Sequence, residues 1–128
     1  MDYVIDDKCL TAKEFIRLAD SVWHRDYNEE ETYAALSKTI NITCRDGERL
    51  VGSVRILTDG VYFGTITEIL VHPDYREQGI GRRLMELVKD NTPTKLYFGS
   101  RPDAIGFYEK LGLERGFESF TITPNGKK

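Results

Sequence analysis

The sequence has few of the features that mark nucleic-acid-binding, disulfide-rich or membrane-spanning proteins. Its formal net charge is −3, so it lacks the basic surface that a nucleic-acid-binding domain needs. Its two cysteines, Cys9 and Cys44, are too few for a disulfide scaffold and do not have the spacing of a metal motif. No apolar run approaches the roughly 18 residues of a membrane span. We therefore expect reduced, buried cysteines, no nucleic-acid or membrane partner, and no metal.

The composition is that of one folded domain. The chain has 128 residues, of which 40% are hydrophobic and 30% are charged, which favours a packed core over disorder. The first seven residues contain no basic segment of the kind that begins a signal peptide. We expect a single domain over residues 1–128 and a cytoplasmic location.

Two helices and an antiparallel meander are predicted for the first 71 residues. Thr11 and Glu14 form a capping box ahead of an amphipathic helix, and Asn28 is the predicted N-cap of a second helix that ends near residue 38. From residue 39 the hydrophobic period becomes two, and Asp-Gly pairs at 46–47 and 59–60 predict hairpin turns. The expected strands are residues 3–5, 40–44, 49–57 and 61–71.

A crossover connection is predicted for the rest of the chain. A helix begins at Gly79 or Gly81 and ends near residue 91, and a strand follows at 95–98. Strand, helix and strand in this order predict that strands 61–71 and 95–98 are parallel. The last expected elements are a helix over residues 103–111, which Gly112 caps, and a strand over residues 117–123.

The most informative segment is the glycine-containing loop at residues 76–81, which joins a strand to a helix. Unpaired N–H groups at a helix N-terminus and the helix dipole favour an anion there. A dinucleotide-binding motif requires a third glycine where this sequence has Leu84, and a P-loop requires a Gly-Lys-Ser/Thr sequence that is absent. The loop therefore predicts a phosphate-binding site of another kind.

The sequence resembles the GNAT N-acetyltransferase superfamily. The family's acyl-CoA motif, Arg/Gln-x-x-Gly-x-Gly/Ala, is matched by Arg76, Gly79 and Gly81, and residues 104–112 match its C-terminal helix. The resemblance is strongest over residues 66–113 and extends to the order of elements along the whole chain. It implies an α/β fold of the α+β kind, a single domain with a mixed, mostly antiparallel sheet, a central βαβ crossover and helices on both faces.

The resemblance also implies that acetyl-CoA is the cosubstrate. A Cβ at Gly79 or Gly81 would block a phosphate or the required backbone angle. The family pairs the pantetheine arm of acetyl-CoA with the end of the strand before the loop, where a backbone N–H polarises the thioester carbonyl. The expected cofactor-binding residues are Ile69, Leu70, Val71, Arg76, Glu77, Gln78, Gly79, Ile80, Gly81, Arg82 and Tyr108.

Two residues are candidates for acid–base catalysis. An alkylammonium acceptor must lose a proton before it attacks, and Glu68, a charge within an apolar strand, is the candidate base or substrate anchor. Glu68 could equally be a solvent-facing strand residue. Tyr108 matches the family's tyrosine near the CoA sulfur, and its phenol can protonate the departing thiolate. Tyr108 could also be a plain core aromatic.

The acceptor is the least determined part of the prediction. Acidic and aromatic residues between the first two helices could bind a cationic amine, although acids are also favoured at any helix start. The candidates are Trp23, Asp26, Tyr27 and Glu30. Residues 59–71 resemble the small-amine branch of the family, so we expect direct transfer of the acetyl group to a primary amine of a small molecule.

Three points stay open from the sequence. The alternatives are a protein or peptide N-acetyltransferase and a non-catalytic CoA-binding module on the same fold. Arg101 stands where many family members have an asparagine that contacts the CoA arm. The family often dimerises, and the strand expected at 117–123 is a possible pairing edge for a homodimer.

Overall fold

The computed structural model describes residues 1–127. The chain divides into two compact units, residues 1–98 and the remainder from residue 99 onward, and each is described by itself.

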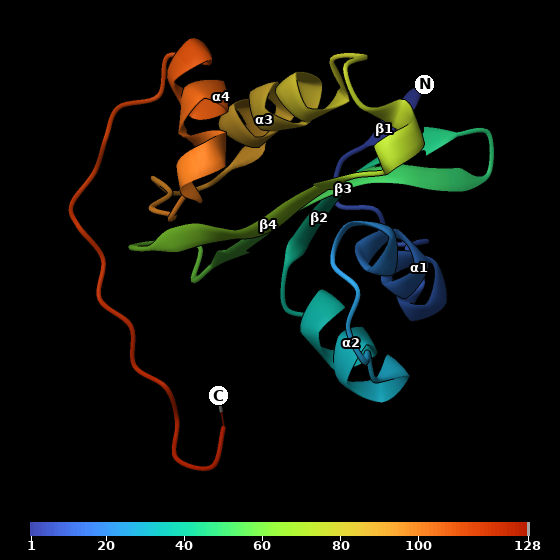
Figure 1. Ribbon diagram of the computed structural model, residues 1–128, viewed down its shortest axis with the longest axis horizontal. Helices are drawn as coiled ribbons and strands as arrows, with labels where there is room; N and C mark the ends of the chain where they lie inside the picture. Colours follow the sequence, from blue (N-terminus) through green and yellow to red (C-terminus); the bar gives the residue numbers. More distant parts are fainter. Residues whose placement is uncertain (128) are drawn as a thin grey trace. The chain divides into compact units, whose positions relative to one another are not determined.

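The first unit is built on a four-stranded antiparallel sheet. Its strands lie in the order β1-β2-β3-β4, so β4 is an edge strand of the sheet (Figure 1). Both predicted hairpin turns are present, with Gly47 and Gly60 at the positive φ angles of 61° and 84° that favour glycine. The strands are β1 (Asp2–Val4), β2 (Ile40–Asp46), β3 (Arg49–Thr58) and β4 (Gly64–Val71).

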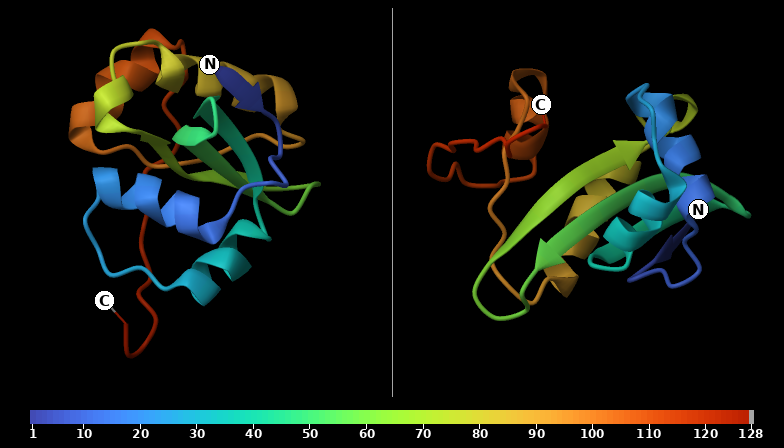
Figure 2. Two further views of the ribbon diagram at one scale, coloured as in Figure 1. Left: turned by 90° about the vertical axis from the view of Figure 1, so that its right-hand side faces the viewer. Right: turned by 90° about the horizontal axis from the view of Figure 1, so that it is seen from below.

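Helices cover both faces of this sheet, as Figure 2 shows. On one face, α1 (Ala12–Val22) and α2 (Glu29–Leu36) enclose a hydrophobic cluster that includes Phe15, Leu18 and Leu70. Helix α3 (Ile80–Asn91) lies on the other face. It packs so closely there that a Cβ added to Gly52 of β3 would meet the side chains of Ile80 and Leu84. Side chains alternate along β3 and β4, so neighbouring residues of a strand belong to different faces.

The predicted helix starts are confirmed. The Thr11 hydroxyl accepts from the Glu14 N–H at 3.2 Å, and the Glu14 carboxylate accepts from the Thr11 N–H at 2.8 Å. The Asn28 side chain accepts from the Glu31 N–H at 2.9 Å and caps α2. These local hydrogen bonds explain why the sequence was sufficient to locate both helices.

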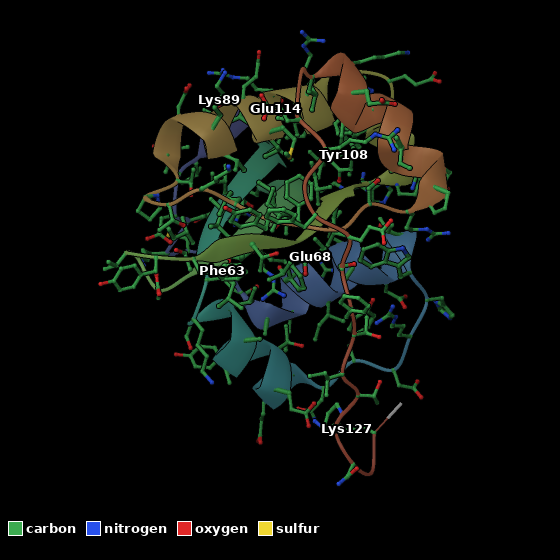
Figure 3. The ribbon with its side chains drawn as sticks, turned by 90° about the vertical axis from the view of Figure 1, so that its left-hand side faces the viewer. Phe63, Glu68, Lys89, Tyr108, Glu114 and Lys127 are labelled. Carbon is green, nitrogen blue, oxygen red and sulfur yellow. The ribbon has the colours of Figure 1, made fainter. Side chains whose placement is uncertain are left out.

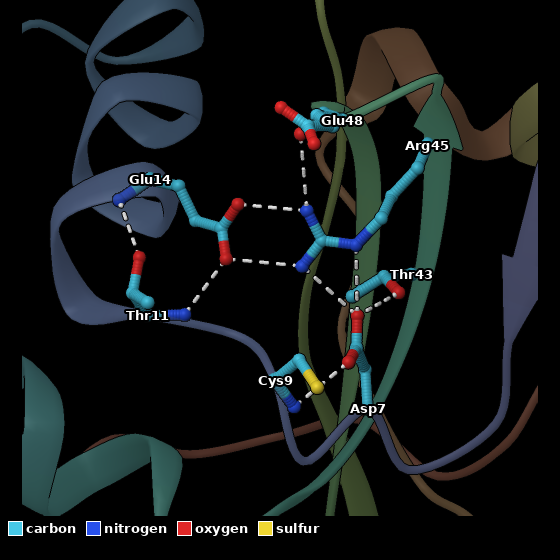
Figure 4. Close-up of polar contacts among 7 residues, drawn as sticks. All are labelled: Asp7, Cys9, Thr11, Glu14, Thr43, Arg45 and Glu48. Atoms are coloured by element: carbon cyan, nitrogen blue, oxygen red, sulfur yellow. Dashed lines mark hydrogen bonds and ion pairs between the residues drawn. The ribbon is translucent and has the colours of Figure 1, made fainter.

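Arg45 of β2 ties the N-terminal loop and α1 to the sheet (Figure 4). Its guanidinium contacts both carboxylate oxygens of Glu14, at 2.7 and 3.0 Å, and Asp7 Oδ2 at 3.0 to 3.1 Å. Asp7 also accepts from the Thr43 hydroxyl at 2.7 Å and from the Cys9 N–H at 3.0 Å. All three charged side chains are largely withdrawn from solvent, so their charges depend on one another.

The second unit contains short helical segments. A 3₁₀ turn at Pro102–Ala104 leads into α4 (Ile105–Lys110), and Gly112 follows with a φ of 78°. A left-handed glycine just after a helix is a common way to end it, so the predicted cap at Gly112 is confirmed.

Two of the predicted strands are wrong. Residues 95–98 are not assigned as a strand, although the Tyr97 N–H donates to the Gly64 carbonyl at 2.9 Å. The sheet is therefore antiparallel throughout the described residues. Residues 117–123 are not a strand either, because they pair with no other strand of residues 1–127, and their side chains Phe117, Phe120 and Ile122 are 94–96% exposed.

Two smaller expectations also change. Strand β4 begins at Gly64 rather than at residue 61, because the Asp59 carboxylate accepts from the N–H groups of residues 61, 62 and 63 and holds them in a turn. Cys44 is buried as expected, whereas Cys9 is exposed, and both are free thiols. Within the described residues, no helix has the length and apolar character needed to cross a membrane.

Replacing Arg45 should destabilise the protein strongly. Arg45→Met leaves Asp7 and Glu14 without their shared cation, and breaking a buried ion pair costs about 3 kcal/mol or more of unfolding free energy. Urea denaturation at pH 7 measures the difference. The matched control, Arg83→Met, removes an arginine that is half exposed, and we expect a change within about 0.5 kcal/mol. Equal losses in the two variants would contradict the role of Arg45.

Stability should also decrease in acid. Burial opposes ionisation of Asp7, but hydrogen bonds from Thr43, the Cys9 N–H and Arg45 outweigh it and lower the pKa of Asp7. The Arg45 hydrogen bond lowers the pKa of Glu14. Because lowered carboxyl pKa values stabilise the folded state only above the unfolded values near 4, the unfolding free energy should fall as pH drops below about 4. Asp7→Asn should make this decrease shallower, and an unchanged slope would refute the assignment.

Candidate active site

The loop between β4 and α3 has an unusual backbone conformation. Glu77 has a φ of 63° and Gly79 a φ of 80°, so two of its residues are left-handed. A left-handed φ is uncommon for a residue other than glycine, and residues in this region next to right-handed ones direct successive N–H groups into a concave surface that suits an anion. The sequence predicted this conformation for glycine alone, and no local pattern indicated that Glu77 would share it.

The start of α3 adds further donors to this loop. The first intrahelical hydrogen bond runs from the Arg83 N–H to the Gly79 carbonyl at 3.0 Å. The N–H groups of Ile80, Gly81 and Arg82 come before it, so they have no acceptor within the helix. Gly79 is the N-cap and has no side chain with which to bind them. The side chains of Arg76 and Arg82 are exposed beside the loop, and no acidic residue lies in the first turn of the helix. The backbone and both arginines thus favour a phosphate here.

The end of β4 presents polar backbone groups at the edge of the sheet. The His72 N–H donates to the Val51 carbonyl of β3 at 2.8 Å, so His72 has its backbone turned toward β3. In an antiparallel ladder this direction alternates along the strand. The N–H and C=O groups of Leu70 therefore face β3, while those of Ile69 and Val71 face the edge. Of the three residues expected to pair with a pantetheine arm, Ile69 and Val71 have the required direction.

Glu68, labelled in Figure 3, lies on the α1 face of β4 and forms an ion pair with Arg55 of the neighbouring strand β3. Arg55 of β3 donates to both carboxylate oxygens of Glu68, at 2.6 and 2.9 Å, and the Thr67 hydroxyl donates to Oε1 at 2.9 Å. Both charged side chains are 13% exposed. The Arg55 guanidinium also lies 5.4 Å from the centre of the Phe15 ring of α1. Glu68 is therefore not the solvent-facing residue that the sequence left open.

A β-bulge creates this arrangement. Arg55 pairs with Glu68 and Ile56 pairs with Ile66, so Thr67 is an extra residue opposite the β3 strand. A bulge locally changes the direction of side chains, and here the extra residue supplies a hydroxyl to its neighbour Glu68. Arg55 is a residue of the candidate site that sequence reasoning missed. A charge in the middle of an otherwise apolar strand was the available signal, but the bulge hid its partner.

Of the aromatic acceptor candidates, Tyr27 lies near enough to Glu68 for the two to interact electrostatically. Trp23 and Tyr27 pack, partly buried, against the hydrophobic cluster beneath α1, and the Tyr27 hydroxyl donates to the Trp23 carbonyl at 2.7 Å. Burial raises the pKa of Tyr27, and the charges of Asp20 and Glu68 add to this effect against that of Arg25. Asp26 and Glu30 are exposed, and Glu30 lies in the acidic first turn of α2.

Tyr108 belongs to the second unit and lies on α4. It is half-buried against the edge of the Phe107 ring, and burial raises the pKa of its phenol. A raised pKa keeps the phenol protonated at neutral pH, as a proton donor requires. That Tyr108 lies near the CoA sulfur stays a prediction from the family resemblance.

Arg101 opens the 3₁₀ turn that precedes α4. Its carbonyl accepts from the Ala104 N–H at 2.9 Å, and its exposed side chain lies 3.6 Å from Asp103. Nothing in this arrangement assigns it a contact with a ligand. Over residues 1–127 no three His, Cys, Asp or Glu side chains are grouped as metal ligands would be.

Comparisons with known proteins agree on one family. The family described as "Acetyltransferase (GNAT) domain" matches residues 37–115. An uncharacterized N-acetyltransferase, ycf52, of Porphyra purpurea is 29% identical over 120 residues, which cover 87% of this chain and 69% of that protein.

Solved structures show the same fold. A putative GNAT-family acetyltransferase from Xanthomonas campestris superposes with a TM-score of 0.77 at 18% identity, covering 94% of each chain. An aminoglycoside 6'-N-acetyltransferase complexed with coenzyme A superposes with a TM-score of 0.75 at 18% identity, covering 88% of this chain and 84% of that one.

Gly79 should contribute separately to the stability of the fold and to the binding of acetyl-CoA. Gly79→Ala places a Cβ on a left-handed residue, which costs about 1 kcal/mol of unfolding free energy although no atom lies within 4 Å of that Cβ. Gly79→Asn should recover most of this stability, since asparagine tolerates the left-handed region. Both variants should bind acetyl-CoA more weakly in calorimetry, because either Cβ lies where a phosphate would approach. Unchanged acetyl-CoA affinity in Gly79→Asn would show that this loop is not part of the cofactor site.

Proposed function

The chain belongs to the GNAT acetyltransferase family and is an N-acetyltransferase, and from this premise we propose that its acceptor is a primary amine of a small molecule. The observation that carries the proposal is the Glu68 carboxylate, held between Arg55 and Thr67 beside the partly buried aromatic residues Trp23 and Tyr27. Such a surface suits a compact amine with an apolar part.

The residues on the α3 side fit acetyl-CoA. The left-handed Glu77 and Gly79, together with the first N–H groups of α3, would hold its pyrophosphate. The edge-facing backbone groups of Ile69 and Val71 would bind the amide-bearing pantetheine arm. Acetyl-CoA supplies the thioester, and an edge N–H at this end of β4 would polarise the thioester carbonyl during attack.

The ion pair determines how Glu68 can take part in the reaction. Oε1 accepts two hydrogen bonds, from Arg55 and Thr67, whereas Oε2 accepts one from Arg55. A carboxylate oxygen has about two acceptor positions, so Oε2 keeps one for a water or for the acceptor ammonium. We place Glu68 as the group that receives the amine proton, through a water, while Arg55 keeps its carboxylate in position.

Tyr108 is the proposed acid. Its raised phenol pKa keeps the proton available for the thiolate that leaves when the amine attacks. This role follows the family resemblance, which implies that Tyr108 lies near the CoA sulfur.

The location and assembly of the protein complete the proposal. Two free thiols, Cys9 and Cys44, support a reducing compartment such as the cytoplasm. The exposed side chains Phe117, Phe120 and Ile122 support association with a second copy of the chain, since large apolar side chains are rarely left so exposed.

A screen of small primary amines and of peptides with acetyl-CoA, followed by release of free thiol, tests the proposed function. We expect turnover with small amines, with kcat/KM values above those for peptide N-termini or lysines. Faster turnover of peptides than of small amines would show that the acceptor is a peptide or protein amine and would contradict the proposal. Tight binding of acetyl-CoA without turnover on either panel would indicate a non-catalytic CoA-binding module.

Two variants in the same assay test the assigned roles. Tyr108→Phe should lower kcat by about a hundredfold and change the Kd for acetyl-CoA far less, because the ring stays in place and proton donation is lost. Glu68→Gln should lower kcat/KM for the amine most strongly near neutral pH, where the amine is protonated. Tyr62→Phe is the matched control, since Tyr62 is 88% exposed at the tip of the β3–β4 turn and should keep full activity. Equal kcat values for Tyr108→Phe and this control would refute the acid role.

A further inference from the structure

A cavity opens on the α1 face of the sheet, at the end of β4. Its volume is about 250 Å³, and it is lined by Glu14, Arg17, Leu18, Glu48, Arg49, Leu50 and His72. The two leucines are buried and form an apolar floor, while the two arginines and the histidine supply nitrogen donors. This combination does not belong to the acetyl-transfer site described above.

The protonation of His72 follows from its hydrogen bonds. Its Nδ1 accepts from the Asp74 backbone N–H at 3.1 Å, where it caps the 3₁₀ turn at residues 73–75. While Nδ1 accepts this bond, the proton of the neutral ring lies on Nε2; a proton on Nδ1 would instead face the Asp74 carboxylate, whose Oδ2 is 3.8 Å away. The Nε2–H then projects toward Arg49.

With the proton on Nε2, Arg49 and His72 place two donors against each other. Nη2 of Arg49 lies 3.2 Å from Nε2 of His72, and a guanidinium has no acceptor to offer. The Arg49 guanidinium is further placed by the Tyr75 ring, 5.5 Å away, and Tyr75 is itself anchored through a 2.6 Å bond to Asp46. Two facing donors held in this way need a shared acceptor, and an anion supplies one.

The acidic residues at the cavity restrict which anion fits. Glu14 has both carboxylate oxygens engaged by Arg45 and the Thr11 N–H. The Glu48 carboxylate also lines the cavity and has no hydrogen bond or ion pair with any of residues 1–127. Two glutamates nearby disfavour a dianion such as phosphate and leave a singly charged carboxylate as the better match. The leucine floor and the small volume favour a short aliphatic chain.

We propose that this cavity, between Arg17, Arg49 and His72, is a binding site for a small carboxylate. The oxygens of the ligand accept from the Arg49 guanidinium and from Nε2–H of His72, Arg17 provides a second cation, and the aliphatic part rests on Leu18 and Leu50.

This site is separate from the acetyl-transfer chemistry. His72 follows Glu68 and Leu70 on the same face of β4, four residues or roughly 13 Å beyond Glu68 along an extended strand. Leu70, which is 1% exposed, fills the space between them. The loop that would bind pyrophosphate leads into α3, on the opposite face of the sheet. An occupant of the cavity would thus contact the end of β4 without entering the donor or acceptor site.

Nitrogen-detected NMR of the two histidine rings tests the site directly. The chain contains only His24 and His72, and His24, an exposed ring beside Asp20, is the internal control. We expect His72 in the Nε2–H form, and we expect sodium butyrate to shift the His72 resonances with saturation, while sodium chloride at equal ionic strength does not. A proton on Nδ1, or no saturable shift of His72, would overturn the proposal.

Variants then identify the groups responsible. Arg49→Gln and Arg17→Gln should each raise the Kd for butyrate at least about tenfold, because each removes a charge-assisted contact. The matched control, Lys13→Gln, removes a cation from the same helix but outside the cavity lining, and its Kd should stay within about twofold. Inorganic phosphate should shift His72 less than butyrate does. Equal Kd values in all three variants, or a stronger response to phosphate, would exclude a carboxylate site.

Discussion

The contact of Arg45 with Asp7 and Glu14 determines where α1 lies on the sheet, and much of the molecule depends on that position. Glu14 is at once the capping-box residue of α1 and the partner of Arg45, so the start of the helix and its attachment to β2 are the same contact. Helix α1 places Phe15 against Arg55 and places Arg17 at the cavity that Arg49 and His72 also line. Trp23, the residue after the helix, packs with Tyr27 against the same hydrophobic cluster. One guanidinium thus aligns two separate surfaces.

Strand β4 separates the donor and acceptor halves of the proposed reaction. Its side chains alternate between the α1 face, which holds Glu68 and Leu70, and the α3 face, while its backbone groups at Ile69 and Val71 point along the sheet to the open edge. A thioester at this edge would lie within reach of groups on either face. The strand therefore allows an acyl donor and an amine to approach from different sides without competing for the same side chains.

The sequence predicted those features that depend on residues close together in the chain, and it failed for those that depend on distant partners. The capping box of α1, the N-cap of α2, the Asp-Gly turns and the glycine after α4 involve residues a few positions apart, and all were predicted correctly. The Arg55–Glu68 pair depends on a bulge, whose position no local pattern reveals. The strands expected at 95–98 and 117–123 have suitable residues, but a strand exists only with a partner, and none of the described strands supplies one.

The ion pair also changes what the acceptor site can recognise. If Glu68 were a free carboxylate, its charge alone would attract a cationic amine. Arg55 cancels that charge at 2.6 Å, so long-range attraction must come from the exposed acids of the α1–α2 segment and the first turn of α2, which salt screens within about 8 Å. Near the ion pair, selection then depends on the aromatic surface and on the single free position of Glu68 Oε2. Such a site discriminates by the shape of the amine and the direction of its proton rather than by its charge.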